Sequence, residues 1–189
     1  MRLISKRVIM ALAAVVLLGT GSVLASPSAP SPDSSAYLSG RASTLLAEIQ
    51  KETAALTFHA DTLGTFAWNP QYSWQSHATY LDRVKGHINA VGDRIAGLQQ
   101  MRYAVLPWQQ QAITDVTSHA AQVAASTQAA IVHLRENQNR LFVSEYRDHL
   151  TTIADRSGNM KQTVDKFLDY EEAQQRLNRL KGELEIKGT

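Results

Sequence analysis

Apolar and small residues recur every three or four positions along most of the chain after residue 35. A step of three or four residues returns a side chain to the same face of an α-helix, whereas a strand would alternate every second residue. The pattern therefore predicts long amphipathic helices and no sheet. In the first predicted helix, residues 36–67, the repeating core positions are Leu45, Leu46, Ile49, Thr53, Leu56, Ala60, Leu63 and Ala67.

Prolines separate the next two predicted helices. Pro70 lies in the loop before a helix from Trp74 to Val105, and Pro107 begins the third helix, where its missing N–H leaves no hydrogen bond unmade. No proline follows Pro107, so the rest of the chain is free to be helical. The core positions are Leu81, Val84, Ile88, Val91, Ile95 and Leu98 in the second helix, and Ile113, Val116, Ala120, Val123, Thr127, Ala130 and Leu134 in the third.

The fourth predicted helix is the longest. It follows a break at residues 137–139, and its repeat continues through residues 156–159, where a Ser-Gly-Asn sequence could form a turn. Because the register is unbroken there, we expect one long helix, kinked at most. Its core positions are Val143, Tyr146, Leu150, Ile153, Ser157, Met160, Val164 and Phe167, after which the repeat changes phase to Leu177, Leu180 and Leu184.

These four segments predict an all-α fold, an elongated up-down-up-down four-helix bundle with coiled-coil-like packing and a longer C-terminal helix. The repeat averages 3.5 residues, which is typical of helices packed nearly parallel or antiparallel, and short loops join antiparallel neighbours. We assign residues 36–170 to the bundle and 171–189 to a coiled-coil-like extension of the last helix. An elongated helical hairpin that completes its core by dimerising is the alternative architecture, and an exposed, unpaired helix end is the alternative for the extension.

The first 25 residues have the pattern of a secretory signal peptide. Three basic residues precede an apolar stretch of residues 8–19 and a small-residue end at Ala25. The apolar stretch is shorter than the ~20 residues of a transmembrane helix, so we expect export to the periplasm or medium, with cleavage near Ala25. Retention as an uncleaved inner-membrane anchor is the alternative. Residues 26–35 hold three of the five prolines and predict a Pro/Ser-rich linker.

Charge and cysteine content narrow the function classes. Of 19 Lys and Arg residues, three lie in the signal segment, which leaves 16 basic against 17 acidic side chains and a net charge of −1 after cleavage. A nearly neutral chain without a basic block offers no electrostatic footprint for nucleic acid or, beyond the signal segment, for a membrane surface. The absence of cysteine excludes disulfides, thiolate zinc sites and covalently attached haem.

The sequence carries no catalytic motif. A di-metal bundle needs Glu-x-x-His on its helices, but none of the six histidines has an acidic residue three positions before it. No two histidines lie one helical turn apart as in zinc hydrolases, and Gly-rich phosphate loops and a Gly-x-Ser-x-Gly elbow are missing. We therefore predict a protein that is not an enzyme and requires no cofactor. An enzyme whose active site is assembled from residues of several helices is the alternative.

An up-down topology brings several histidines and aromatic residues to one end of the bundle. We hypothesise that His77, His133, His149 and Trp74 bind a small ligand, haem or a transition metal there, because neutral imidazole is a common metal ligand. The alternative is a hydrophobic plug that closes the bundle. The residues expected at this end are His59, His77, His133, His149, Phe66, Trp68, Tyr72, Trp74, Phe142 and Tyr146.

Two further sets of residues predict contacts with proteins. Trp68 and Tyr72 lie in a short loop where polar residues would suffice, and exposed Trp and Tyr often anchor partners. Leu177, Leu180 and Leu184 form the apolar face of the extension. The leading hypothesis is thus an exported, non-enzymatic bundle that binds an unknown protein or a second copy of itself through the C-terminal helix. The His/aromatic end as a ligand, metal or haem site is the alternative.

Overall fold

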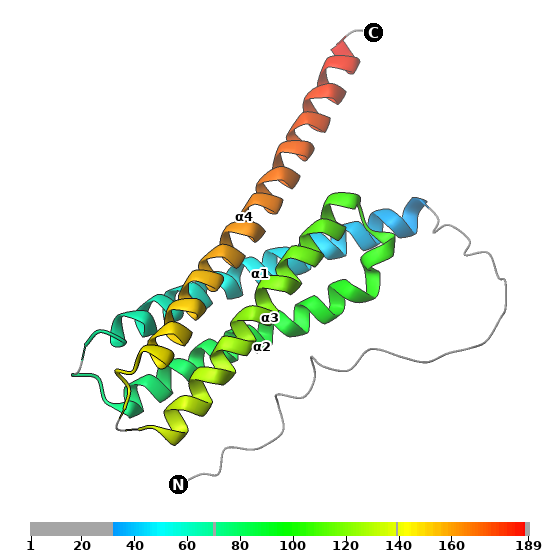
Figure 1. The fold of residues 1–189 in the computed structure, drawn as a ribbon. Coiled ribbons are helices and arrows are strands. Elements are labelled where there is room, and N and C mark those ends of the chain that lie inside the picture. The colour runs from blue at the N-terminus through cyan, green and yellow to red at the C-terminus, as the bar shows by residue number, and fades with distance from the viewer. Residues whose placement is uncertain (1–31, 70, 139, 188–189) are drawn as a thin grey trace, which may run out of the picture. The chain divides into compact units, whose positions relative to one another are not determined.

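The computed structural model describes residues 32–69, 71–138 and 140–187, and it confirms the all-α class. Four long helices pack against one another, and the described residues contain no strand. The helices are α1 (Pro32–Phe66), α2 (Trp74–Met101), α3 (Pro107–Glu136) and α4 (Ser144–Lys187), with a short 3-10 helix, η1 (Arg102–Ala104), between α2 and α3 (Figure 1).

Each long helix packs against its neighbours in chain order, and α4 also packs against α1. The hydrogen bonds between α1 and α4 run in opposite sequence directions: Ser43 bonds to Glu171, and Gln50, further along α1, bonds to the earlier residue Asp165. The ion pairs between α1 and α2 also run in opposite sequence directions. Glu48 pairs with Arg94, and Glu52, further along α1, pairs with the earlier residue His87. Helices that share these contacts are therefore antiparallel.

The predicted core positions form the interior of the bundle. All of those named for the second and third helices are buried in α2 and α3, and so are those of α1 apart from the half-buried Leu45. In α4 the positions from Tyr146 to Val164 are buried, whereas Val143 and Phe167 at either end are partly exposed. The 3-4 spacing thus places the same residues inside as the structure does. Whether the helices pack as in a coiled coil stays a prediction.

Two helix ends differ from the predictions. The first helix begins at Pro32, inside the predicted linker of residues 26–35, and α2 ends at Met101 instead of Val105. Proline is favoured at the first position of a helix. A proline in a linker-like sequence can therefore begin a helix, whereas a proline within a helix marks its end more reliably. Beyond Met101 the chain tightens into η1 before the turn that leads to Pro107.

The segments assigned to export lie outside the described residues. These are the predicted signal peptide, residues 1–25, and the first part of the linker. Among the described helices, none has a stretch apolar and long enough to cross a bilayer.

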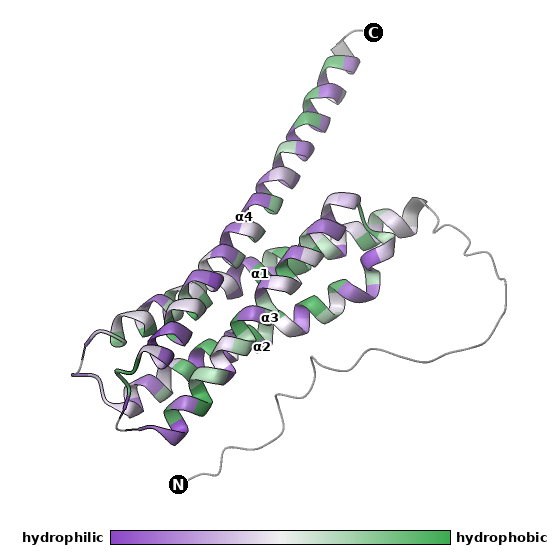
Figure 2. Cartoon of the chain, viewed as in Figure 1, coloured by the Kyte–Doolittle hydropathy of each residue, from purple (hydrophilic) through white to green (hydrophobic). Residues whose placement is uncertain are grey.

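The last helix is continuous and longer than the bundle requires. It passes through Ser157 and Asn159 without interruption, and Ser157 is fully buried, so no turn forms there. The C-terminal part of the helix projects away from the other three (Figure 1). Glu171 still accepts a hydrogen bond from Ser43 of α1, and residues 172–181 beyond it are exposed. We call residues 171–187 the α4 extension, and apolar residues recur along it (Figure 2).

Candidate functional site

A buried histidine lies at the end of the bundle where α1 ends and α2 begins. His77 is fully buried, and its Nδ1 is 3.1 Å from the hydroxyl of Tyr146 on α4, which is also buried. Its Nε2 has no hydrogen-bond partner among the described residues. Burial lowers the pKa of His77 to about 4 and raises the pKa of Tyr146 above its usual range. Both side chains are therefore neutral at neutral pH.

Other rings pack around this pair and close the bundle. The ring of Phe66 meets His77 edge-on with centroids 5.4 Å apart, and Tyr72 from the first loop stacks on Phe66 at 3.8 Å. On the far side His133 stacks on Tyr146 at 5.0 Å. We call Phe66, Tyr72, His77, His133 and Tyr146 the aromatic cluster. Its packing supports the hydrophobic-plug interpretation for these residues.

The remaining aromatic residues at this end are exposed, and Tyr72 at the edge of the cluster is 37% exposed as well. Trp68 is 70% exposed, and the guanidinium carbon of Arg147 lies 4.7 Å from the centre of its ring. Trp74 and Phe142 are 37% and 47% exposed. An Arg over an indole face is a favourable cation–π contact, but it leaves most of the ring open. Only part of the loop therefore folds inward, and Trp68 keeps the exposure expected of a binding residue.

The four histidines expected at this end do not converge on one point. His77 and His133 both contact the ring of Tyr146. His59 instead stacks on His87 with ring centroids 5.3 Å apart, between α1 and α2. The Nδ1 of His87 lies 2.9 Å from a carboxylate oxygen of Glu52.

The His59–His87 pair is a feature that sequence reasoning missed. Burial lowers the pKa of His59, and the nearby charges of His87 and Arg83 lower it further. The two histidines are far apart in sequence and belong to different helices, so helical spacing alone could not pair them. A prediction of which faces of α1 and α2 meet would have been needed.

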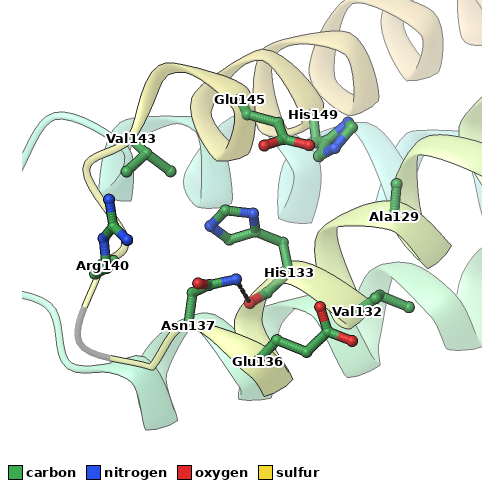
Figure 3. A pocket seen from close by; sticks show the side chains of 9 residues that line it. All are labelled: Ala129, Val132, His133, Glu136, Asn137, Arg140, Val143, Glu145 and His149. Carbon is green, nitrogen blue, oxygen red and sulfur yellow. Dashed lines mark hydrogen bonds between the residues drawn. The ribbon is translucent and has the colours of Figure 1, made fainter.

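His133 and His149 do line a common pocket, with a volume of about 470 Å³, between the end of α3 and the first turns of α4 (Figure 3). Carboxylates and a cation share its wall, so the lining is polar and of mixed charge. His77 and Trp74, the other two candidate ligand residues, are not among the lining residues. The wall is formed by Ala129, Val132, His133, Glu136, Asn137, Arg140, Val143, Glu145 and His149.

The pocket does not have the geometry of a metal centre. Among the described residues no three His, Asp or Glu side chains converge as metal ligands. His133 has a buried Nε2 without a hydrogen-bond partner in the described part of the chain, and it stacks on Tyr146. The chemistry that these side chains offer is hydrogen bonding and charge pairing with a small polar molecule.

A second buried polar centre lies at the start of α3. Gln109 is fully buried: its Oε1 accepts hydrogen bonds from Leu106 N (3.1 Å) and Ser39 Oγ (2.9 Å), and its Nε2 donates to Ser39 O (2.9 Å) and Ser43 Oγ (3.0 Å). Ser43 in turn donates to Glu171 at 2.5 Å. A Gln two residues after a first-turn proline is the capping-box position, which is the signal that could have identified it. Because its polar atoms are satisfied internally, Gln109 has a structural role.

The fold and its polar centres define a class of protein: a cysteine-free four-helix bundle with a projecting last helix. The chain matches no protein-family model, and it matches no curated protein and no solved structure either. Among the features that could accept another molecule are the His133 pocket, the exposed Trp68 and the apolar face of the α4 extension.

Proposed function

We propose that this protein is an exported, non-enzymatic bundle that acts through protein contacts made by the α4 extension. The observation that supports the proposal is the exposure of three leucines on one face of that helix. Leu177 is 45%, Leu180 48% and Leu184 71% exposed. Contiguous exposed apolar side chains are typical of partner-binding surfaces.

The energetics of an isolated helix favour a partner for the extension. A helix of this length without tertiary contacts is marginal in water, because helices in proteins are stabilised mainly by burying an apolar face. Complete burial of a leucine side chain contributes about 1.5–3 kcal/mol. Three such side chains, spaced 3 and 4 residues apart, can offset the cost of ordering and bringing together two chains for a modest affinity.

The exported location is the second part of the proposal, and residues 1–25 support it. The order of basic, apolar and small residues in that segment is the order of a signal peptide. Fractionation of cells that express the full chain, with N-terminal sequencing of the exported form, tests it. A mature N-terminus at Ser26 is expected, whereas a full-length chain in the membrane fraction would support the anchor.

The protein-contact proposal is tested with a triple variant, Leu177→Ser, Leu180→Ser and Leu184→Ser. The matched control changes three polar positions of the same helix, Gln175, Asn178 and Arg179, to Ser. We expect the leucine variant to lose association, measured as self-association by light scattering and as retention of co-purifying proteins, and the control to keep it. If the natural chain, the leucine variant and the control variant associate equally, the apolar face is excluded as the contact surface.

A second function is suggested by the pocket that His133 and His149 share. A small molecule with both charges could pair with Arg140 and Glu145 there while the histidines donate or accept hydrogen bonds. Nuclear magnetic resonance titrations with small charged molecules, transition metals and haem test this. A real ligand shifts the His149 ring signals and leaves those of His87 unchanged. Unchanged signals from both histidines with every probe would eliminate this function.

A further inference from the structure

The α4 extension has the residue pattern of a short coiled-coil strand. Its apolar face follows steps of three and four residues, so these residues occupy the a and d positions of heptads. In that frame Leu177 and Leu184 occupy a, and Ala173 and Leu180 occupy d. The flanking positions are Arg176 and Glu183 at g and Gln174 and Lys181 at e. All of these flanking residues are exposed.

Arg176 and Glu183, two charged residues that flank the apolar face, are available to pair with a second helix. Neither Arg176 nor Glu183 forms a salt bridge within the described residues. In coiled coils the residues at e and g pair across the interface and set orientation and register. The charges of this face therefore indicate which helix fits it.

A parallel pairing of two copies is disfavoured by charge. In a parallel coiled coil each g residue lies beside the e residue five positions later in the other helix. Arg176 of each copy would then lie beside Lys181 of the other, which gives two like-charge contacts and no opposite-charge contact among the described residues.

An antiparallel pairing has one register in which the charges are complementary. In antiparallel coiled coils a residues face d residues, and g residues lie near g residues of the other helix. When Leu177 of each copy faces Leu180 of the other, Arg176 lies beside Glu183 in both symmetry-related places. Shifting the pairing by one heptad brings Arg176 beside Arg176 in one direction, or Glu183 beside Glu183 in the other.

Packing and available length agree with this register. It places the small side chain of Ala173 opposite Leu184, next to the central Leu177–Leu180 layers, so that small and large residues alternate. The shift that pairs the arginines would place Leu184 opposite Lys166, at the level where α4 is packed on its own bundle through the buried Val164. The register chosen by charge therefore uses only the part of α4 that is free.

We infer that the α4 extension binds a second copy of this chain in an antiparallel two-helix pairing, with Leu177 facing Leu180 and Arg176 beside Glu183. The inference rests on the proposed function, since it names the partner of the same apolar face. The result is a symmetric dimer in which the two bundles lie at opposite ends of the paired helices. By symmetry both contacts form twice, as in other two-fold interfaces.

Charge reversal tests the register. We expect Arg176→Glu and Glu183→Arg each to weaken dimerisation roughly tenfold, because each turns two opposite-charge contacts into two like-charge contacts. The double variant restores the contacts with exchanged charges and should return the dissociation constant to near its original value. Sedimentation equilibrium over a range of concentrations and at low salt measures all of these constants.

The same variants discriminate the parallel arrangement. In that pairing Arg176→Glu would place a carboxylate beside Lys181 and strengthen the dimer, the opposite of the expected result. The matched controls Arg179→Glu and Glu185→Arg carry the same charge changes on exposed positions away from the interface. They should leave the dissociation constant unchanged, and an equal effect of the controls would overturn the register.

Single cysteines provide an independent readout, because the chain has none of its own. Ala173→Cys mixed with Leu184→Cys should form a disulfide between the two proteins much faster than either forms alone. Preferential Ala173→Cys self-linking would show a parallel pairing and overturn the inference.

Failure of this inference is distinct from failure of the proposed function. A chain that stays monomeric at all concentrations, while a purified partner binds it and is lost with the three leucine-to-serine changes, overturns the second copy as occupant but leaves protein contact intact. A monomer whose associations survive those changes overturns both.

Discussion

At the scale of single residues, the most unusual group in the bundle is the buried His77. A neutral imidazole in the core has one hydrogen bond to Tyr146 and one ring nitrogen without a partner in the described residues. A buried polar atom left unpaired costs about 1–3 kcal/mol, so an apolar side chain would be more stabilising here. What the pair provides is a directional contact between α2 and α4, because a hydrogen bond requires the ring and the hydroxyl to meet at a defined distance and angle.

The buried imidazole predicts that acid destabilises the protein. The pKa of His77 is 6.5 in the unfolded chain and about 4 when folded, so between these values the unfolded state binds a proton that the folded state does not. The free energy of unfolding should therefore fall as the pH falls from 6.5 to 4, by on the order of 3 kcal/mol, and level off below. Urea unfolding at a series of pH values measures this slope.

The variant His77→Asn isolates this contribution from that of the carboxylates. Its amide keeps a hydrogen-bonding group near the position of Nδ1 but does not titrate. The variant should be less stable at pH 7 and should lose less stability than the natural chain between pH 6.5 and 4. Parallel pH curves for the two proteins would assign the acid sensitivity to other groups.

Gln109 is the residue whose loss should cost most among the polar core groups. Gln109→Leu keeps the volume but removes the acceptor of Leu106 N–H and the donor to the carbonyl of Ser39. We expect a loss of about 2–4 kcal/mol in the free energy of unfolding, because the four hydrogen bonds of the buried Gln109 to partly buried groups are lost together. Urea denaturation measures it, with the exposed Gln111→Leu as control. A loss below ~0.5 kcal/mol would show that water satisfies these groups.

At the scale of elements, the helices could be predicted from the sequence because one periodic signal repeats over about thirty residues in each. Ile49, Val84 and Val116 are buried for the same reason, since each lies on the 3-4 repeat. Helix ends depend instead on one or two residues. Pro32 begins a helix although its surroundings have the composition of a linker.

The candidate site could be predicted only in part, because helical spacing fixes which face a residue is on and not which neighbour it meets. His133 and His149 share a pocket, yet His77 points its ring at Tyr146 and His59 pairs with His87. The rotation of each helix about its own axis decides these pairings. That rotation follows from packing of all four helices together.

A substitution of Gly158 tests whether α4 is a regular helix at its centre. Its position is inside the continuous helix, and a Cβ added there meets nothing within 4 Å. Gly158→Ala should therefore raise the free energy of unfolding by about 0.5–1 kcal/mol, since Ala restricts the unfolded chain and favours helix. Thermal unfolding followed by circular dichroism checks this. Destabilisation would indicate that α4 bends at this residue in solution.

At the scale of the whole molecule, the described residues divide into a bundle with its own buried core and an extension that is hydrogen-bonded to it at Glu171. Among the described residues of α4, the last with a hydrogen bond to another helix is Glu171, which accepts from Ser43. Beyond it, Ala173, Leu177, Leu180 and Leu184 are exposed.

Removal of residues 173–189 should consequently leave the bundle intact. At concentrations below those that give dimers, the free energy of unfolding should change by less than ~0.5 kcal/mol, because no interhelical contact is lost. At higher concentrations the full chain should become more stable than the truncated one, since association stabilises the folded state. Chemical unfolding of both chains at two concentrations tests this, and a destabilised truncated monomer would show that the extension supports the bundle.

The continuity of α4 connects the two ends of the molecule mechanically. With 44 residues it is a single rod of about 66 Å. Tyr146, near its first turn, holds the ring of His77, and Leu184 lies near its last turn. A helix resists bending and twisting far more than a loop does, so it acts as a lever. A torque that turned the extension about its axis would rotate Tyr146 relative to His77. It would thereby strain the hydrogen bond between these two residues near the other end of α4.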